Sequence, residues 1–254
     1  MIKTPISLGA VRKLMKKLQS VERRPLAIGG ARQLAVALER ELVRGGDPRA
    51  VRVGDPEGAA VYVHVGDEEA PLRKARRARV PIVAVAFGAE DLPYVYATDI
   101  VRVGPGEPLP VGEIVTAIAA RLGEAGAPLA GRLPVLRGAV CDRIVASIAR
   151  KNGILGAAVF VPGADLPVLA LNQVRMLLLL DQAYGLELDP RQRLPEVIAT
   201  VGAGLGLRAV ARELLDVVPI AGWAVKGGVA YAGTRALGEA AIRRLQLGSD
   251  SRGA

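Results

Sequence analysis

The hydrophobic pattern of this chain changes character about half-way along its 254 residues. Up to about residue 126, short Val-rich runs alternate with amphipathic segments, whereas the later residues follow helical spacing throughout. Strands that alternate with helices predict a parallel α/β sheet, and continuous helical spacing predicts an all-α domain. We therefore expect two folded parts, which a chain of this length can support.

The α/β part is expected over residues 25–126, as a shortened parallel sheet with flanking helices. Its strand-like runs are PLAIGG, AVRVGD, AAVYVHV, PIVAVAFG and TDIVRV. Helical patterns lie between them, in ARQLAVALERELVRGG and DEEAPLRKARRAR, and a third, VGEIVTAIAARLGEAG, closes the part. The continuous apolar run PIVAVAFG is typical of a strand that is covered on both faces.

The helical part is expected over residues 127–248, with a disordered polar tail at 249–254. One helix is predicted from Pro134 to Asn152–Gly153, and later helices are predicted on either side of Pro162–Gly163 and Pro219. Small residues recur at every fourth position near the end of the chain. Because residues four apart share a helix face, they predict a Gly/Ala-packed interface where two helices approach closely. These residues are Ala224, Gly228, Ala232, Ala236 and Ala240.

Residues 1–24 contain a predicted basic amphipathic helix. Apolar residues from Leu8 to Val21 follow helical spacing, and the other face carries Arg12, Lys13, Lys16 and Lys17. Such a helix can lie on an anionic membrane, dock on a partner, or pack against its own protein. The formal net charge of +9 favours anionic surfaces in general.

Residues that carry chemistry are scarce. Cys141 is the only cysteine, which excludes an internal disulfide and a multi-cysteine metal site. His64 is the only histidine, so a histidine triad or metal cluster lacks its second member. The basic run at 73–79 has no interleaved aromatic residues and is interpreted as a solvated helix face, with no specific nucleic-acid partner. We predict no catalytic, cofactor-binding or metal-binding residues, and no cofactor.

A small polar group lies in the otherwise apolar second half. Asp165 precedes Leu-Pro and fits the N-cap of the next helix. Asn172 and Arg175 follow within one apolar segment. Because buried polar groups need partners, we expect these residues to hold the helix break together.

Three blocks of the second half support a resemblance to a known family. PGADLPVLALNQVRM, GLGLRAVARELL and PIAGWAVKGGVAYAGTRALGEAAIR occur in this order. Over residues 136–245 the chain resembles the uncharacterised helical domain found with bacterial GTPases, the YcjF-like group. The resemblance implies association with GTPase domains and membranes, and it brings no established activity.

In that context, the first half resembles a shortened G domain of the Era-like or dynamin-like type. The sequence differs from G domains at the residues that bind nucleotide. The phosphate loop G-x-x-x-x-G-K-[ST] is absent, and Gly29–Gly30 runs directly into a predicted helix. Of the guanine-recognition motif only Asp91 remains, while Asp55 and Gly58 fit Asp-x-x-Gly. These positions predict a degenerate domain that neither binds GTP tightly nor hydrolyses it.

The resulting functional expectation is a non-catalytic adaptor or scaffold of the bacterial cytoplasm, associated with the cytoplasmic face of a membrane. The N-terminus lacks the apolar run of a signal peptide, which favours the cytoplasm. Expected partners are an anionic membrane surface, a GTPase or other protein, or a second copy of the chain. Two alternatives are a divergent nucleotide-binding protein and a soluble helical partner-binding module.

Overall fold

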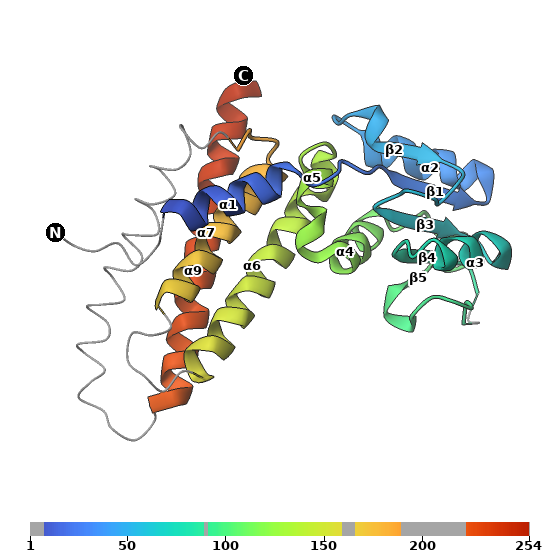
Figure 1. The fold of residues 1–254 in the computed structure, drawn as a ribbon. Coiled ribbons are helices and arrows are strands. Elements are labelled where there is room, and N and C mark those ends of the chain that lie inside the picture. Colours follow the sequence, from blue (N-terminus) through green and yellow to red (C-terminus); the bar gives the residue numbers. More distant parts are fainter. Residues whose placement is uncertain (1–7, 89–90, 159–165, 189–221, 254) are drawn as a thin grey trace. The chain divides into compact units, whose positions relative to one another are not determined.

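The structure is a computed structural model that describes residues 8–88, 91–158, 166–188 and 222–253 (Figure 1). The described chain divides into two compact units. An α/β unit comprises residues 22–143 and 183–185, and a helical unit contains the remaining described residues. Both predicted fold classes are therefore confirmed: a parallel sheet with flanking helices, followed by a helical region.

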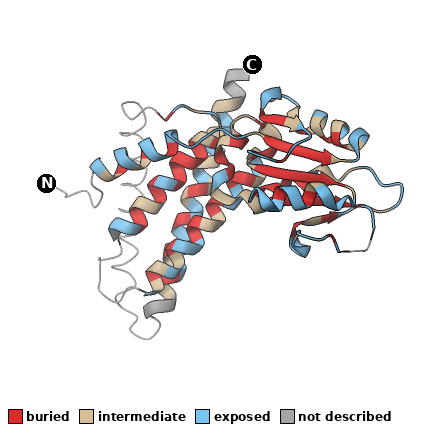
Figure 2. Cartoon of the chain, turned by 45° about the vertical axis from the view of Figure 1, so that its right-hand side comes forward, coloured by how far each residue is buried: buried red, intermediate tan, exposed pale blue. Residues whose placement is uncertain are grey.

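The α/β unit is built on five parallel strands in the order β2-β1-β3-β4-β5. This is the strand order of flavodoxin-like sheets, in which the order of strand addition reverses and leaves a topological switch point between β1 and β3. The inner strands β3 and β4 are buried at every position (Figure 2). The strands are β1 (Leu26–Gly30), β2 (Val51–Val53), β3 (Val61–Val65), β4 (Ile82–Ala86) and β5 (Ile100–Arg102).

Helices pack on this sheet at three places. Helix α2 (Arg32–Val43) packs on β1 and β2, α3 (Glu69–Arg77) on β3 and β4, and α4 (Val111–Leu122) on β3, β4 and β5. The core beneath α3 includes Leu72 and Tyr62. The connection from β2 to β3 contains no helix. The α/β unit is therefore shortened by one crossover helix, while all five predicted strand-like runs form strands of the sheet.

Short helical turns complete the α/β unit: η1 (Pro48–Ala50), η2 (Ala97–Asp99), η3 (Gly123–Gly126) and α5 (Ala127–Ala130). Helix α6 (Pro134–Ala158) then begins within this unit, and the division between units falls after residue 143, not at residue 127 as predicted. Within this unit, the Arg132 Nε and Nη2 atoms donate to Asp47 Oδ2 at 3.0 and 2.9 Å. This ion pair fixes residues just before α6 to the start of η1.

The helical unit contains α1 (Leu8–Gln19), the later part of α6, α7 (Leu166–Ala183) and α9 (Gly222–Gly253). The predicted end of a helix at Asn152–Gly153 is wrong, because α6 continues to Ala158. Asn152 is fully buried and its amide bonds to neighbouring helices instead of ending its own. The predicted disordered tail is also wrong, since α9 continues to Gly253 and Ser249 Oγ donates to the Gln246 carbonyl at 2.7 Å.

Candidate functional site

Helices α6 and α9 of the helical unit approach each other almost to backbone contact. A Cβ atom added at Gly227 would lie 2.9 Å from the Gly153 carbonyl oxygen and 3.0 Å from Ala157 Cβ. One at Gly156 would lie 2.8 Å from Ala230 Cβ. Close packing through Gly and Ala therefore occurs, as expected for this part of the chain.

The predicted small-residue stripe, however, is not the face that makes this contact. Gly228, Ala232, Ala236 and Ala240 are exposed, and a Cβ atom added at Gly228 would meet nothing within 4 Å. The side chain of Ala224 lies outside the described residues. Because a helix turns by about 100° per residue, a strict every-fourth row drifts by about 40° at each step and leaves any one face. The observed seam mixes spacings of three and four, and consists of Gly227, Ala230, Thr234 and Gly238.

A buried polar network joins α6, α7 and α9. The Asn152 amide nitrogen donates to Thr234 Oγ1 at 3.0 Å, and Asn152 Oδ1 accepts from the amide nitrogen of Asn172 at 2.8 Å. Gln173 also donates to Thr234 Oγ1, at 3.2 Å. The predicted structural role of Asn172 fits this network, although the network joins three helices and not a helix break. Arg175 is exposed, and Asp165 lies outside the described residues.

Helix α1 packs against its own protein, which was one of the three alternatives for a basic amphipathic helix. Val11 and Met15 have no exposed surface, and Leu18 is buried beside them. At the end of the helix, Gln19 Nε2 donates to the Leu188 carbonyl at 2.6 Å and Gln182 Nε2 donates to the Leu18 carbonyl at 3.4 Å. The apolar face of α1 is thus occupied, and insertion of that face into a bilayer would require α1 to detach.

The opposite face of α1 is exposed and cationic. Within the described part of the chain, its four basic side chains form neither ion pairs nor side-chain hydrogen bonds. The sequence segments of the helical unit (1–21, 144–182 and 186–254) carry 17 basic and 9 acidic residues, a net charge of +8. The α/β segments carry 17 and 16, a net charge of +1. We call Arg12, Lys13, Lys16 and Lys17 the α1 basic face.

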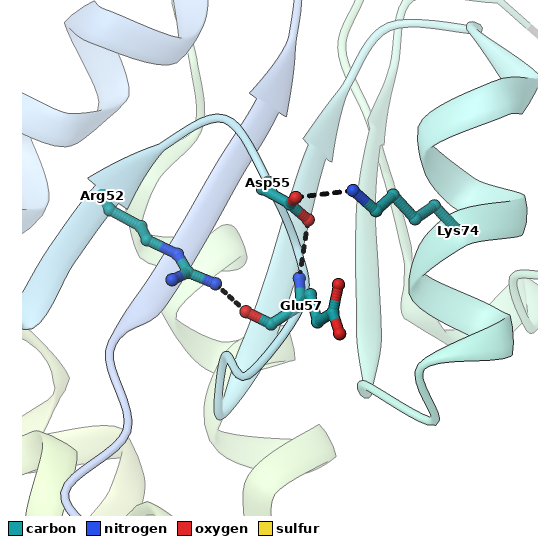
Figure 3. A network of polar contacts seen from close by, with 4 residues as sticks. All are labelled: Arg52, Asp55, Glu57 and Lys74. Atoms are coloured by element: carbon teal, nitrogen blue, oxygen red, sulfur yellow. Dashed lines mark hydrogen bonds and ion pairs between the residues drawn. The ribbon is translucent and has the colours of Figure 1, made fainter.

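The positions predicted as remnants of a G domain have structural partners in the α/β unit. Asp55 Oδ2 pairs with Lys74 Nζ at 2.5 Å, and Asp55 Oδ1 accepts from the Glu57 backbone amide at 2.9 Å (Figure 3). The hydrogen bond from Lys74, followed by that from Glu57, lowers the pKa of Asp55. Asp91 pairs with Arg102 at 3.1 Å, and Gly58 adopts a φ of +72°. These contacts hold two loops, from β2 to β3 and from β4 to β5.

The turn from β1 to α2 is tight. Ala31 alone separates Gly30 from Arg32, and its backbone amide donates to the Val65 carbonyl at 2.8 Å. Gly30 has a φ of +94°, and any Cβ atom there would overlap the Val65 carbonyl. A phosphate loop needs several free amides in a wider turn. The observed geometry thus agrees with the short turn that the sequence indicates.

A buried tyrosine–histidine pair lies on β3. The Tyr62 hydroxyl lies 3.3 Å from His64 Nδ1, and both side chains are buried. Burial raises the pKa of Tyr62 to about 12 and lowers the pKa of His64, which favours the neutral imidazole. His64 Nε2 has no hydrogen-bond partner among the described residues. Sequence alternation places both side chains on one strand face, but their contact and burial come from the fold.

Two further features of the described residues bear on function. A shallow, open depression lies at the C-terminal end of α2, lined by Arg40, Arg44 and Pro48 among others. It is remote from the carboxyl ends of the strands, where ligands bind in sheets of this class. In the described ranges, no three His, Cys, Asp or Glu side chains are grouped to hold a metal ion. Nor do the described helices include one that combines the length and hydropathy needed to cross a membrane.

Comparison with known proteins gives no further assignment. No protein-family model, no curated protein and no solved structure matches this chain.

Proposed function

We propose that this protein is a non-catalytic adaptor whose helical unit attaches to an anionic membrane surface through the α1 basic face. The observation that carries the proposal is that one face of α1 is buried and the other is exposed. Its apolar face is buried in the helical unit, while its four cations are exposed and lack partners among the described residues. A docked helix holds these charges in a fixed arrangement, which reduces the entropy lost on binding.

The magnitude of the attraction is sufficient for peripheral attachment. A basic residue near an anionic leaflet contributes about 1 kcal/mol, so four contribute up to about 4 kcal/mol. At about 1.4 kcal/mol per factor of ten, this is close to a thousandfold increase in membrane partition. Because the apolar face is occupied, binding is expected to be electrostatic and to weaken with salt.

The α/β unit is proposed to have a scaffolding role. The tight β1–α2 turn supports this part of the proposal, because the Ala31 amide is already bonded to Val65. The ion pairs of Asp55 and Asp91 support it further, since both carboxylates have protein cations as partners. The resemblance to a GTPase-associated helical domain motivates the proposal that a GTPase is one protein partner.

Sedimentation with lipid vesicles tests the membrane proposal. The intact chain is mixed at low salt with phosphatidylcholine vesicles that contain about one third phosphatidylglycerol. We expect the protein to sediment with these vesicles, to be released by salt, and to remain in solution with phosphatidylcholine alone. Changing the α1 basic face to Gln (Arg12→Gln, Lys13→Gln, Lys16→Gln, Lys17→Gln) should reduce partition by more than a hundredfold.

A charge-matched control uses four exposed arginines of the α/β unit. It removes the same formal charge from another surface and should leave vesicle binding nearly unchanged. Equal losses in the two variants would show that vesicle binding is not specific to the α1 basic face. Recovery of the wild-type protein in the soluble fraction at low salt would refute membrane attachment. The control substitutions are Arg73→Gln, Arg76→Gln, Arg77→Gln and Arg79→Gln.

A further inference from the structure

Helix α3 and the residue after its C-cap expose four arginines. Elsewhere in the α/β unit, Arg102, Arg121 and Arg132 each pair with an aspartate. The four α3 arginines, by contrast, make no ion pair or side-chain hydrogen bond within the described chain. We call Arg73, Arg76, Arg77 and Arg79 the α3 arginine face.

Two acidic side chains close to this face have other partners. Glu69 precedes Arg73 by one turn, a favourable spacing for a helix ion pair. Its Oε1 atom instead accepts a hydrogen bond from the Tyr94 hydroxyl at 3.3 Å. Asp55 pairs with Lys74, on the side of α3 next to the β2–β3 connection (Figure 3). The guanidinium groups thus stay available although carboxylates lie close by.

Tyr94 brings an exposed aromatic ring to the start of α3. Tyr94 is 43% exposed, while Leu92 is buried and Val95 packs on the same core. Its φ of +68° is unusual for a bulky residue and costs about 1–2 kcal/mol. Arg79, with a φ of 55°, is the other non-glycine residue of positive φ in the described ranges. Strain that persists in an otherwise regular unit is a reason to suspect function.

We infer that the α3 arginine face and Tyr94 together bind single-stranded nucleic acid. The guanidinium groups bind backbone phosphates, and an unpaired base stacks on the Tyr94 ring, whose hydroxyl is held by Glu69. The ring distinguishes this ligand from an acidic peptide, which offers carboxylates but no base to stack. The basic run has no aromatic residue within it, and the fold supplies one from the connection between β4 and β5.

This site is independent of the proposed membrane attachment, because it lies on the other unit and uses different side chains. Its strength is expected to depend strongly on salt. Each phosphate neutralised on a single strand contributes a slope of about −0.7 in a plot of log affinity against log salt, so four contacts give about −2.8. Stacking of one base contributes a factor of about ten to affinity.

Fluorescence anisotropy of the intact protein tests the inference, with labelled oligouridine and oligothymidine of about 12 nucleotides and a duplex of equal length. We expect both single strands to bind more tightly than the duplex. The four Arg→Gln changes of the α3 arginine face should bring the salt slope close to zero. Tyr94→Ala should weaken single-strand binding about tenfold, whereas Tyr94→Phe, which keeps the ring, should bind like wild type.

The α1 Gln variant is the matched control, because it removes the same charge from the other unit. It should retain most single-strand binding, and loss equal to that of the α3 variant would overturn the inference. Equal binding of duplex and single strand, with no effect of Tyr94→Ala, would also overturn it. Loss of vesicle binding in the α3 variant, without loss of oligonucleotide binding, would assign the α3 arginine face to lipid. Failure of vesicle binding alone would leave this inference intact.

Discussion

The crossing of α6 and α9 predicts that the same substitution at two adjacent glycines changes stability in opposite directions. Gly227 is buried in the seam, whereas Gly228 is exposed. Replacing either glycine by alanine improves helix propensity by about 0.8–1 kcal/mol. Gly228→Ala has no steric cost, because its Cβ atom meets nothing within 4 Å. This variant should therefore be more stable than wild type by up to about 1 kcal/mol.

Gly227→Ala incurs a packing cost as well. Its Cβ atom would lie 2.9 Å from the Gly153 carbonyl oxygen, which is backbone and cannot rotate away. Overpacking of this kind costs about 1–3 kcal/mol, so the net change should be a destabilisation of up to about 2 kcal/mol. The two variants should differ by about 1–3 kcal/mol.

Thermal and urea melts of the two variants measure this difference. For a chain of this length, 1 kcal/mol shifts the melting temperature by about 2–4 °C. Gly228→Ala should melt above wild type and Gly227→Ala below it. Gly156→Ala, whose Cβ atom would lie 2.8 Å from Ala230 Cβ, should behave like Gly227→Ala. If Gly227→Ala proved as stable as Gly228→Ala, the close approach of α6 and α9 would be wrong.

Two further predictions concern acid and nucleotide. Burial lowers the pKa of His64, so at mildly acidic pH the His64 imidazole binds a proton more readily in the unfolded chain than in the folded chain. Stability should therefore fall as the pH drops below about 6.5, the ordinary histidine pKa. His64→Leu should remove this loss of stability, whereas Tyr62→Phe should keep it. If the urea midpoints of wild type and His64→Leu changed in parallel between about pH 6.5 and 5, the argument would be contradicted. GTP and ATP with Mg²⁺ should bind no tighter than about 1 mM in calorimetry, and a micromolar dissociation constant would favour the divergent nucleotide-binding alternative.

Sequence patterns were sufficient for the five strands and the three longer helices of the α/β unit. Alternation in β3 and the continuous apolar run of β4 follow from strand geometry, because successive side chains point to opposite faces. The tight β1–α2 turn was also predictable, since Gly29–Gly30 leads directly into helical spacing. The strand order, by contrast, could not be predicted. It depends on which strands pair, and local pattern carries no information about that choice.

The faces of α9 show what only tertiary structure decided. Small residues occupy two neighbouring faces, and the sequence favoured the row that contains Gly228. The partner helix selects the row that contains Gly227, because Gly153 and Gly156 of α6 lie opposite it. Tertiary contacts also decided the role of Asn152, since Asn-Gly normally marks a helix end. Here bonds to Thr234 and Asn172 satisfy its buried amide within a continuing helix.

The charged faces of α1 and α3 also depend partly on sequence and partly on tertiary structure. The sequence alone determined that α1 has an apolar and a basic face, because helical periodicity is a local property. Only the fold decided that the apolar face is covered by the protein itself, so that charge is what α1 presents to a partner. The sequence likewise contained the arginines of α3 but placed no aromatic ring among them. Tyr94 reaches α3 through the β4–β5 connection, because side chains distant along the chain become neighbours only when the sheet assembles.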